Sequence, residues 1–62
     1  MVPVEALKLA LNKETGSIEL YKKLCDEHSD NDELKDLFSF LVNEEEKHKK
    51  MIEQKIFDMT KG

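Results

Sequence analysis

The chain has 62 residues, a net charge of −4 from ten Lys and fourteen Asp or Glu, and a single cysteine. A chain this short gains only about 3–5 kcal/mol from its own core, so it needs a disulfide, a metal ion or a partner chain as well. One cysteine excludes an intrachain disulfide and a four-cysteine metal site, and the acidic, mixed charge pattern argues against nucleic-acid binding.

The first predicted element is a helix over about residues 4–27. Pro3 suits its first turn, where a missing backbone N–H does no harm. Apolar residues recur with helical spacing and form one stripe: Leu7, Ala10, Leu11, Ile18, Tyr21 and Cys25. Glu14 lies at the centre of this stripe, so a helix that buries the stripe also buries a carboxylate.

A turn is predicted at about residues 28–30, where polar residues that favour turns and caps interrupt the pattern. Asp30 is expected to be the N-cap of the next helix, and Glu33 completes a capping box with it. The second helix then covers about residues 31–59. The sequence therefore predicts an all-α fold, with one helical-hairpin domain over residues 1–62.

The second helix carries its own apolar stripe and places two polar side chains within it. The stripe consists of Leu34, Leu37, Phe38, Leu41, Ile52, Ile56 and Met59. Glu45 and His48 fall near its centre, whereas Glu46 and Lys47 point away. Burying an isolated carboxylate costs several kcal/mol unless a partner or a metal ion compensates. A bound metal ion would explain why the sequence places Glu45 and His48 within an apolar stripe.

The hairpin geometry predicts that three candidate ligands meet. Glu14 lies about 15 residues before the turn, and Glu45 and His48 lie about 15 to 18 residues after it. At about 1.5 Å per residue, all three lie roughly 22–27 Å from the turn. Three ligands do not close a site, and two helices do not enclose a core. A homodimer that forms a four-helix bundle would enclose a core and double the number of ligands. Its four carboxylates would balance the charge of two divalent ions.

Other interpretations of these residues stay open at this stage. Glu45 and His48 form a buried ion pair, or face solvent if the helix is rotated. Tyr21 is a core aromatic whose hydroxyl needs a partner, or a residue that acts beside the metal. Three large apolar residues lie off the stripes and are either scattered on the surface or part of a second interface: Leu20, Phe40 and Phe57.

The pattern around these residues resembles the rubrerythrin and ferritin-like family. Tyr21 follows Glu14 by seven residues, and after a short acidic turn the motif Leu-Phe-x-x-Leu-Val-x-Glu-Glu-Glu-Lys-His ends at His48. The resemblance covers about residues 4–56. It implies that Glu14 is a terminal carboxylate ligand, Glu45 a carboxylate that bridges two irons, and His48 a terminal nitrogen ligand. Tyr21 would form a hydrogen bond near the cluster.

The half length of the chain resembles the encapsulated ferritins, in which metal sites form between two hairpin subunits. The resemblance implies a di-iron protein with two ions per dimer that oxidises Fe(II) or reduces O₂ or peroxide; manganese and zinc are the alternative metals. A ferroxidase-like oxidoreductase is favoured over a peroxidase, because Leu11 stands where rubrerythrins carry an extra Glu. The alternative is a helical dimerisation module with no metal, or with a structural metal and no turnover.

The expected partner is a second copy of the chain. No apolar run approaches the roughly 20 residues that cross a bilayer, and the first four residues lack the basic and apolar regions of a signal peptide. The expected location is therefore the cytoplasm.

Overall fold

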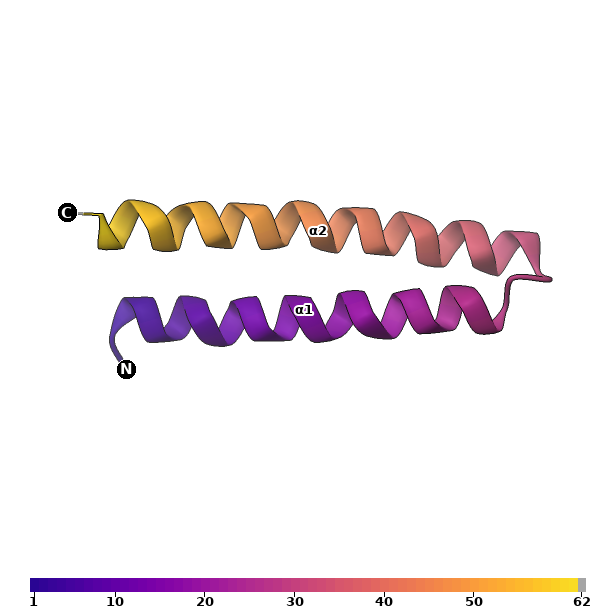
Figure 1. The fold of residues 1–62 in the computed structure, drawn as a ribbon, viewed down its shortest axis with the longest axis horizontal. Coiled ribbons are helices and arrows are strands. Elements are labelled where there is room, and N and C mark those ends of the chain that lie inside the picture. The colour runs from indigo at the N-terminus through magenta and orange to yellow at the C-terminus, as the bar shows by residue number, and fades with distance from the viewer. Residues whose placement is uncertain (62) are drawn as a thin grey trace.

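The chain forms two long antiparallel helices joined by a short turn (Figure 1). In this computed structural model, which describes residues 1–61, α1 spans Pro3–Glu27 and α2 spans Asp32–Thr60. Gly62, the last residue of the expected domain, lies outside the described residues. No strand occurs within residues 1–61. The prediction of an all-α helical hairpin is therefore confirmed.

The hairpin is a single layer of two helices. Its dimensions are 48 × 17 × 11 Å, and the smallest of them is about the diameter of one helix. Each helix therefore touches only its neighbour and leaves two flat faces of the hairpin uncovered. Neither helix, over the part of the chain that is described, is both long and apolar enough to cross a membrane.

The start of α1 follows from its first residues. Pro3 lies in the first turn, after Val2 in an extended conformation with φ −73° and ψ 151°. Glu5 also lies in this turn, where a negative charge interacts favourably with the helix dipole. At the other end, the backbone N–H of His28 donates a hydrogen bond of 3.1 Å to the carbonyl of Leu24.

The N-cap of α2 is Asn31, so the prediction of Asp30 with a capping box to Glu33 is wrong. The Asn31 side-chain oxygen accepts a hydrogen bond of 3.1 Å from the backbone N–H of Leu34. Its own N–H donates to the carbonyl of His28 at 3.0 Å. This second bond closes the turn and leaves Asp30 inside it. Both residue types are good caps, and the length of the turn selects the later one.

The contact between the helices covers part of each apolar stripe and extends past one edge of the α2 stripe. Ile18 and Val42 are the buried apolar side chains of residues 1–61, with exposed fractions of 7% and 9%. Val42 lies about 60° around α2 from Glu45, at one edge of the predicted stripe. The hairpin therefore buries one edge of each stripe and leaves the other edge open.

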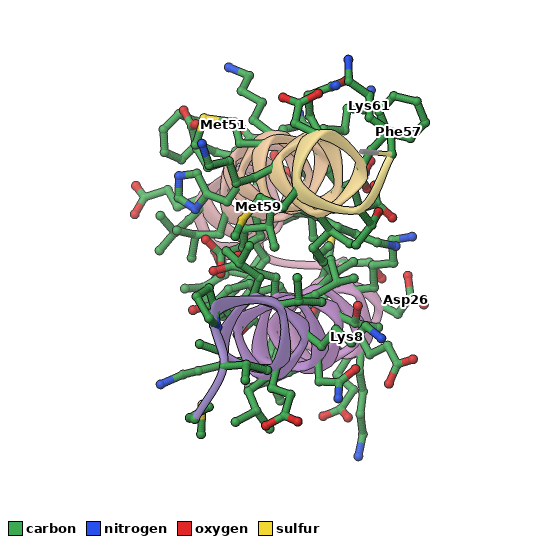
Figure 2. The ribbon with its side chains drawn as sticks, turned by 90° about the vertical axis from the view of Figure 1, so that its left-hand side faces the viewer. Lys8, Asp26, Met51, Phe57, Met59 and Lys61 are labelled. Atoms are coloured by element: carbon green, nitrogen blue, oxygen red, sulfur yellow. The ribbon has the colours of Figure 1, made fainter. Side chains whose placement is uncertain are left out.

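The two flat faces of the hairpin differ in chemistry. We call the face that carries Glu14 and His48 the ligand face; at about 100° per residue it also carries Ala10, Ser17, Tyr21, Leu41, Ile52 and Met59. The end-on view in Figure 2 shows Met51 toward one face and the following residues toward the other: Lys8, Asp26, Phe57 and Lys61. The ligand face is thus the one that carries the open apolar edges.

Candidate metal centre

Glu14, Glu45 and His48 meet on the ligand face. His48 Nδ1 lies 3.1 Å from Glu45 Oε1 and 3.7 Å from Glu14 Oε2. One ligand atom from each residue lies within 4.8 Å of the other two. One metal ion can contact three atoms grouped this closely, so the structure brings together the three residues that the sequence singled out.

The positions of these residues follow from the regular geometry of both helices. Glu45 and His48 are three residues apart and therefore project from the same side of α2. Glu14 comes from α1, near the middle of that helix, and the other two lie near the middle of α2. The group is therefore far from the turn and from the helix ends, where fraying is greatest.

The two carboxylates are more shielded from solvent than the imidazole. The exposed fractions of the side chains are 21% for Glu14, 20% for Glu45 and 47% for His48. Glu14 Oε2 is itself buried and has no hydrogen-bond partner. A buried carboxylate oxygen without a partner is costly, and natural structures rarely contain one without a specific reason.

The local electrostatics favour a proton or a cation at Glu14. Burial raises the pKa of the Glu14 carboxyl, and the negative charge of the adjacent Glu45 raises it further. His48 opposes these effects and lowers the same pKa. A divalent ion would neutralise the two carboxylates without a proton and would give Glu14 Oε2 a partner.

The residues present fit a hard or borderline metal ion. Two carboxylates and one imidazole suit iron or manganese, whereas zinc prefers four-coordinate sites that are richer in His or Cys. Three ligand residues leave coordination positions open within one hairpin. The exposed side of His48 faces outward from the ligand face, where further ligands would have to come from another molecule.

Tyr21 lies on the ligand face, two helical turns beyond Glu14. Its ring stacks on Phe38 of α2, with ring centroids 6.3 Å apart and an interplanar angle of 20°. Phe38 in turn approaches His28 at 6.4 Å. The ring of Tyr21 is therefore held by packing between the helices, and its role beside a metal stays a prediction.

The acidic residues on either side of Glu45 do not join the ligands. Glu46 was expected to point away from the stripe, but it is half-buried beside Ile18 and lines a shallow hollow with Lys49 on the face opposite the ligands. Glu44 lies 3.8 Å from Lys47 and forms an ordinary surface ion pair. Neither residue belongs to the group of three that the structure brings together.

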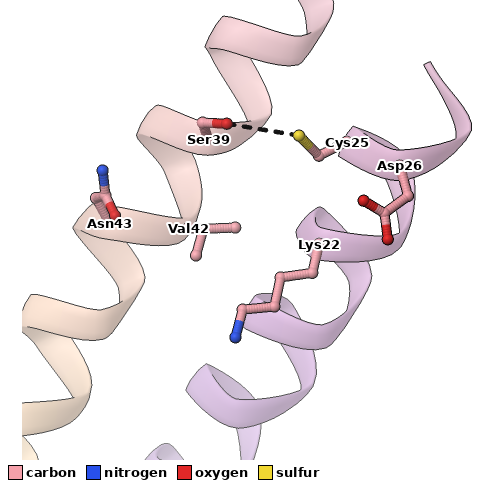
Figure 3. A pocket seen from close by; sticks show the side chains of 6 residues that line it. All are labelled: Lys22, Cys25, Asp26, Ser39, Val42 and Asn43. Atoms are coloured by element: carbon pink, nitrogen blue, oxygen red, sulfur yellow. Dashed lines mark hydrogen bonds between the residues drawn. The ribbon is translucent and has the colours of Figure 1, made fainter. Parts of the chain in front are cut away.

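The single cysteine lies away from the candidate centre. Cys25 Sγ is 3.5 Å from Ser39 Oγ and 3.6 Å from the carbonyl oxygen of Lys35. The thiol lines an open hollow of about 300 Å³. Figure 3 shows the side chains around it: Lys22, Cys25, Asp26, Ser39, Val42 and Asn43. The thiol therefore helps to join the two helices near the turn and is not a ligand of the group.

A model of a known protein family matches most of the chain. The family model described as Rubrerythrin matches residues 5–62. No curated protein and no solved structure matches the chain. The matched region contains all three residues of the candidate centre.

Proposed function

Because this chain belongs to the rubrerythrin family, we propose that it binds iron at a dinuclear centre that two copies of the chain share. The ligands are Glu14, Glu45 and His48 of each copy. The observation that carries the proposal is the geometry of these side chains, with a buried oxygen of Glu14 that has no partner.

Two copies are proposed because one hairpin supplies only half of a suitable ligand set. Paired ligand faces would bring together four Glu and two His, which is the ligand set of ferritin-like di-iron carboxylate bundles. The four carboxylates carry a charge of −4 when ionised, and two divalent ions neutralise it. Pairing would also cover the open apolar edges of the ligand face.

The residues of this chain would bind and orient the ions. Glu14 and His48 would act as terminal ligands from opposite helices, and Glu45 would bridge the two ions, as in related ferritin-like proteins. Packing of Tyr21 against Phe38 would keep its hydroxyl at a fixed height beside the centre. Iron bound there would supply the electrons that reduce O₂ or peroxide as Fe(II) is oxidised.

Oxidation of Fe(II) is favoured over peroxide reduction as the activity. Rubrerythrins that reduce peroxide carry an additional Glu one turn before the ligand of the corresponding helix, and Leu11 occupies that position here. Leu11 is half-buried against α2 and offers no ligand atom. Oxygen-dependent Fe(II) oxidation is therefore the activity to measure first.

The proposal is tested by metal analysis of protein purified after iron supplementation, together with its state of association. We expect two iron ions per dimer, and much less in Glu45→Gln and His48→Ala. Glu46→Gln is the matched control for Glu45→Gln, because it removes the adjacent charge without touching the group. Less than one metal ion per wild-type dimer would contradict the proposal.

A second candidate function, metal-free association, is supported by the 3.1 Å approach of His48 to Glu45. In that case the two side chains would form an ion pair within the interface. Thermal unfolding with and without a chelator separates the candidates, since a metal at a hundred times its dissociation constant adds about 2.7 kcal/mol to stability. A structural zinc or manganese ion would stabilise the protein without Fe(II) oxidation.

A further inference from the structure

The imidazole of His48 has two ring nitrogens, and the hairpin provides a partner for one of them. Nδ1 lies 3.1 Å from Glu45 Oε1 and 3.7 Å from Glu14 Oε2, so this atom faces the candidate centre. None of the hydrogen bonds within residues 1–61 involves Nε2. The second nitrogen of a metal-binding His almost always donates its proton to a carboxylate, a backbone carbonyl or water, and this bond fixes the orientation of the ring.

Glu44 is the side chain that can supply the missing acceptor. The helical neighbours of His48 lie three or four residues before or after it on α2: Glu44, Glu45, Met51 and Ile52. Of these four, only Glu44 and Glu45 carry oxygen atoms, and the Glu45 carboxylate already faces Nδ1. On α1, the residues at about the height of His48 are Ala10 and Leu11, whose side chains carry no acceptor.

The direction of the His48 side chain brings its ring toward Glu44. Helical side chains lean toward the N-terminus of their own helix, so the ring lies over the turn that contains Glu44 and Glu45. Glu44 lies about 40° farther around α2 than His48, at the outer edge of the ligand face. Because Nδ1 faces inward to Glu45, the far side of the ring with Nε2 faces this outer edge.

The present partner of Glu44 holds it only weakly. Glu44 Oε2 is 3.8 Å from Lys47 Nζ, and the exposed fractions of the two side chains are 35% and 72%. An exposed ion pair of this kind adds little to stability. A hydrogen bond from an imidazole N–H to a carboxylate is charge-assisted, and a metal ion on the other nitrogen makes the N–H a stronger donor. Glu44 can therefore leave Lys47 for His48 when a metal binds.

We propose that Glu44 is a positioning residue for the metal centre: it accepts a hydrogen bond from His48 Nε2–H and holds the ring with Nδ1 toward the two ligand carboxylates. In the metal-free chain Glu44 pairs with Lys47, and metal binding transfers it to His48. Glu44 itself does not contact the metal. This inference rests on the proposed metal centre, but not on its activity.

The affinity of the full chain for Fe(II) without oxygen provides the test, measured by competition with a chelator of known affinity. Glu44→Ala should lower this affinity by about 10–100-fold, which is the usual cost of removing the partner of a metal-binding His. Glu44→Gln should recover about half of the loss on a logarithmic scale, because an amide oxygen accepts the same bond at roughly half the strength. Both variants should keep the helical content of wild type in chelator, since Ala and Gln favour helix.

Glu46 provides the matched control, because it also adjoins Glu45 and carries the same charge. It lines a hollow on the face opposite the ligands. Glu46→Ala should change the Fe(II) affinity by less than about threefold, since its charge acts on the centre only through screened attraction. Equal losses in Glu44→Ala and Glu46→Ala, or no recovery in Glu44→Gln, would overturn the inference.

Lys47 allows a second measurement of the same exchange. Lys47→Ala removes the competing partner of Glu44 and should raise the Fe(II) affinity by about threefold. The same substitution should have less effect in the Glu44→Ala background, whereas a direct effect of the Lys47 charge would be equal in both backgrounds. Equal effects would overturn the proposed exchange of partners.

His48→Ala separates this inference from the proposed function. If wild type binds Fe(II) and His48→Ala weakens the binding, while Glu44→Ala behaves like Glu46→Ala, the metal centre stays and the role of Glu44 is overturned. If wild type binds no Fe(II), or His48→Ala changes nothing, the proposed function fails and the role of Glu44 fails with it.

Discussion

Glu14 is the residue whose surroundings conflict most with its own charge. Its Oε2 atom is buried without a partner, and Glu45 and His48 are its nearest polar neighbours. Residues that serve only stability rarely combine burial with an unpaired charge. A bound cation would give the buried Glu14 oxygen a partner. A cation site and a simple Glu14–His48 ion pair predict different effects of removing the Glu14 charge.

Replacing Glu14 by Gln should leave the metal-free protein at least as stable at neutral pH, while abolishing its stabilisation by iron. Gln has nearly the same shape and carries no charge to desolvate. If Glu14 instead served as an ion-pair partner of His48, the same substitution would lower the stability of the metal-free protein. Thermal unfolding of both proteins in chelator and with Fe(II) distinguishes the two cases.

The pH dependence of the stability of the metal-free protein provides a second test of the burial of the Glu14 carboxylate. Because the pKa of Glu14 is raised on folding, the folded chain binds more protons than the unfolded chain in the interval above the ordinary carboxyl pKa. Stability from this group therefore falls as the pH rises through that interval. Denaturation across this range should show a smaller fall for Glu14→Gln, and an equal fall would contradict the assignment.

The residues of the candidate centre could be predicted from spacing alone because helices are regular. Fifteen or so residues on either side of a short turn bring Glu14 level with Glu45 and His48, whatever the details of packing. The rotation of α2 was harder to predict. Val42 and Glu46 lie about 60° and 100° around α2 from Glu45, yet Val42 is buried and Glu46 is half-buried. The periodicity of one helix does not predict how far its neighbour covers each side of the stripe.

At the scale of the elements, Gly16 is the weak point of α1. A methyl group added at this position would meet no atom within 4 Å, and Gly costs about 1 kcal/mol relative to Ala in a helix interior. Gly16→Ala should therefore raise the free energy of unfolding by about 0.5–1 kcal/mol. Chemical denaturation at fixed protein concentration measures the change. A lower stability would show instead that another helix approaches Gly16 closely in the assembled protein.

The helices themselves were predictable because both carry long, consistent patterns, but their ends were less so. Asp30 and Asn31 are adjacent and chemically similar caps, and the choice between them depends on the hydrogen bond that closes the turn at His28. This bond reflects the three-dimensional path of the chain. Local sequence preferences do not determine it.

At the scale of the whole molecule, the hairpin buries little of its apolar surface. Two side chains are buried within residues 1–61. At roughly 25 cal/mol per Å², burying the apolar surface that remains exposed would add several kcal/mol to the free energy of unfolding. We therefore expect the thermal midpoint to rise with protein concentration over a roughly hundredfold range. A midpoint that does not depend on concentration would show that the hairpin folds as a monomer.

A charge placed in the middle of the ligand face should prevent pairing and metal binding together. Leu41 lies on this face one turn before Glu45, so Leu41→Asp would bury an unpaired charge in the interface. Asn43→Asp adds the same charge at an exposed position on the other side and serves as the control. Sedimentation and iron analysis of both variants measure the effect. A Leu41→Asp dimer that retains iron would contradict the shared centre.

Because the candidate ligands come from both helices, a bound metal ion would also affect the rate of unfolding. A metal held by Glu14 and Glu45 joins two points of the chain that are 31 residues apart in sequence. In the unfolded chain, a covalent link closing such a loop is worth about 3–4 kcal/mol of entropy. The ion would therefore act as a removable cross-link, in a chain whose single cysteine allows no internal disulfide. Separation of the helices would have to wait for its release, so iron should slow unfolding as well as shift its equilibrium.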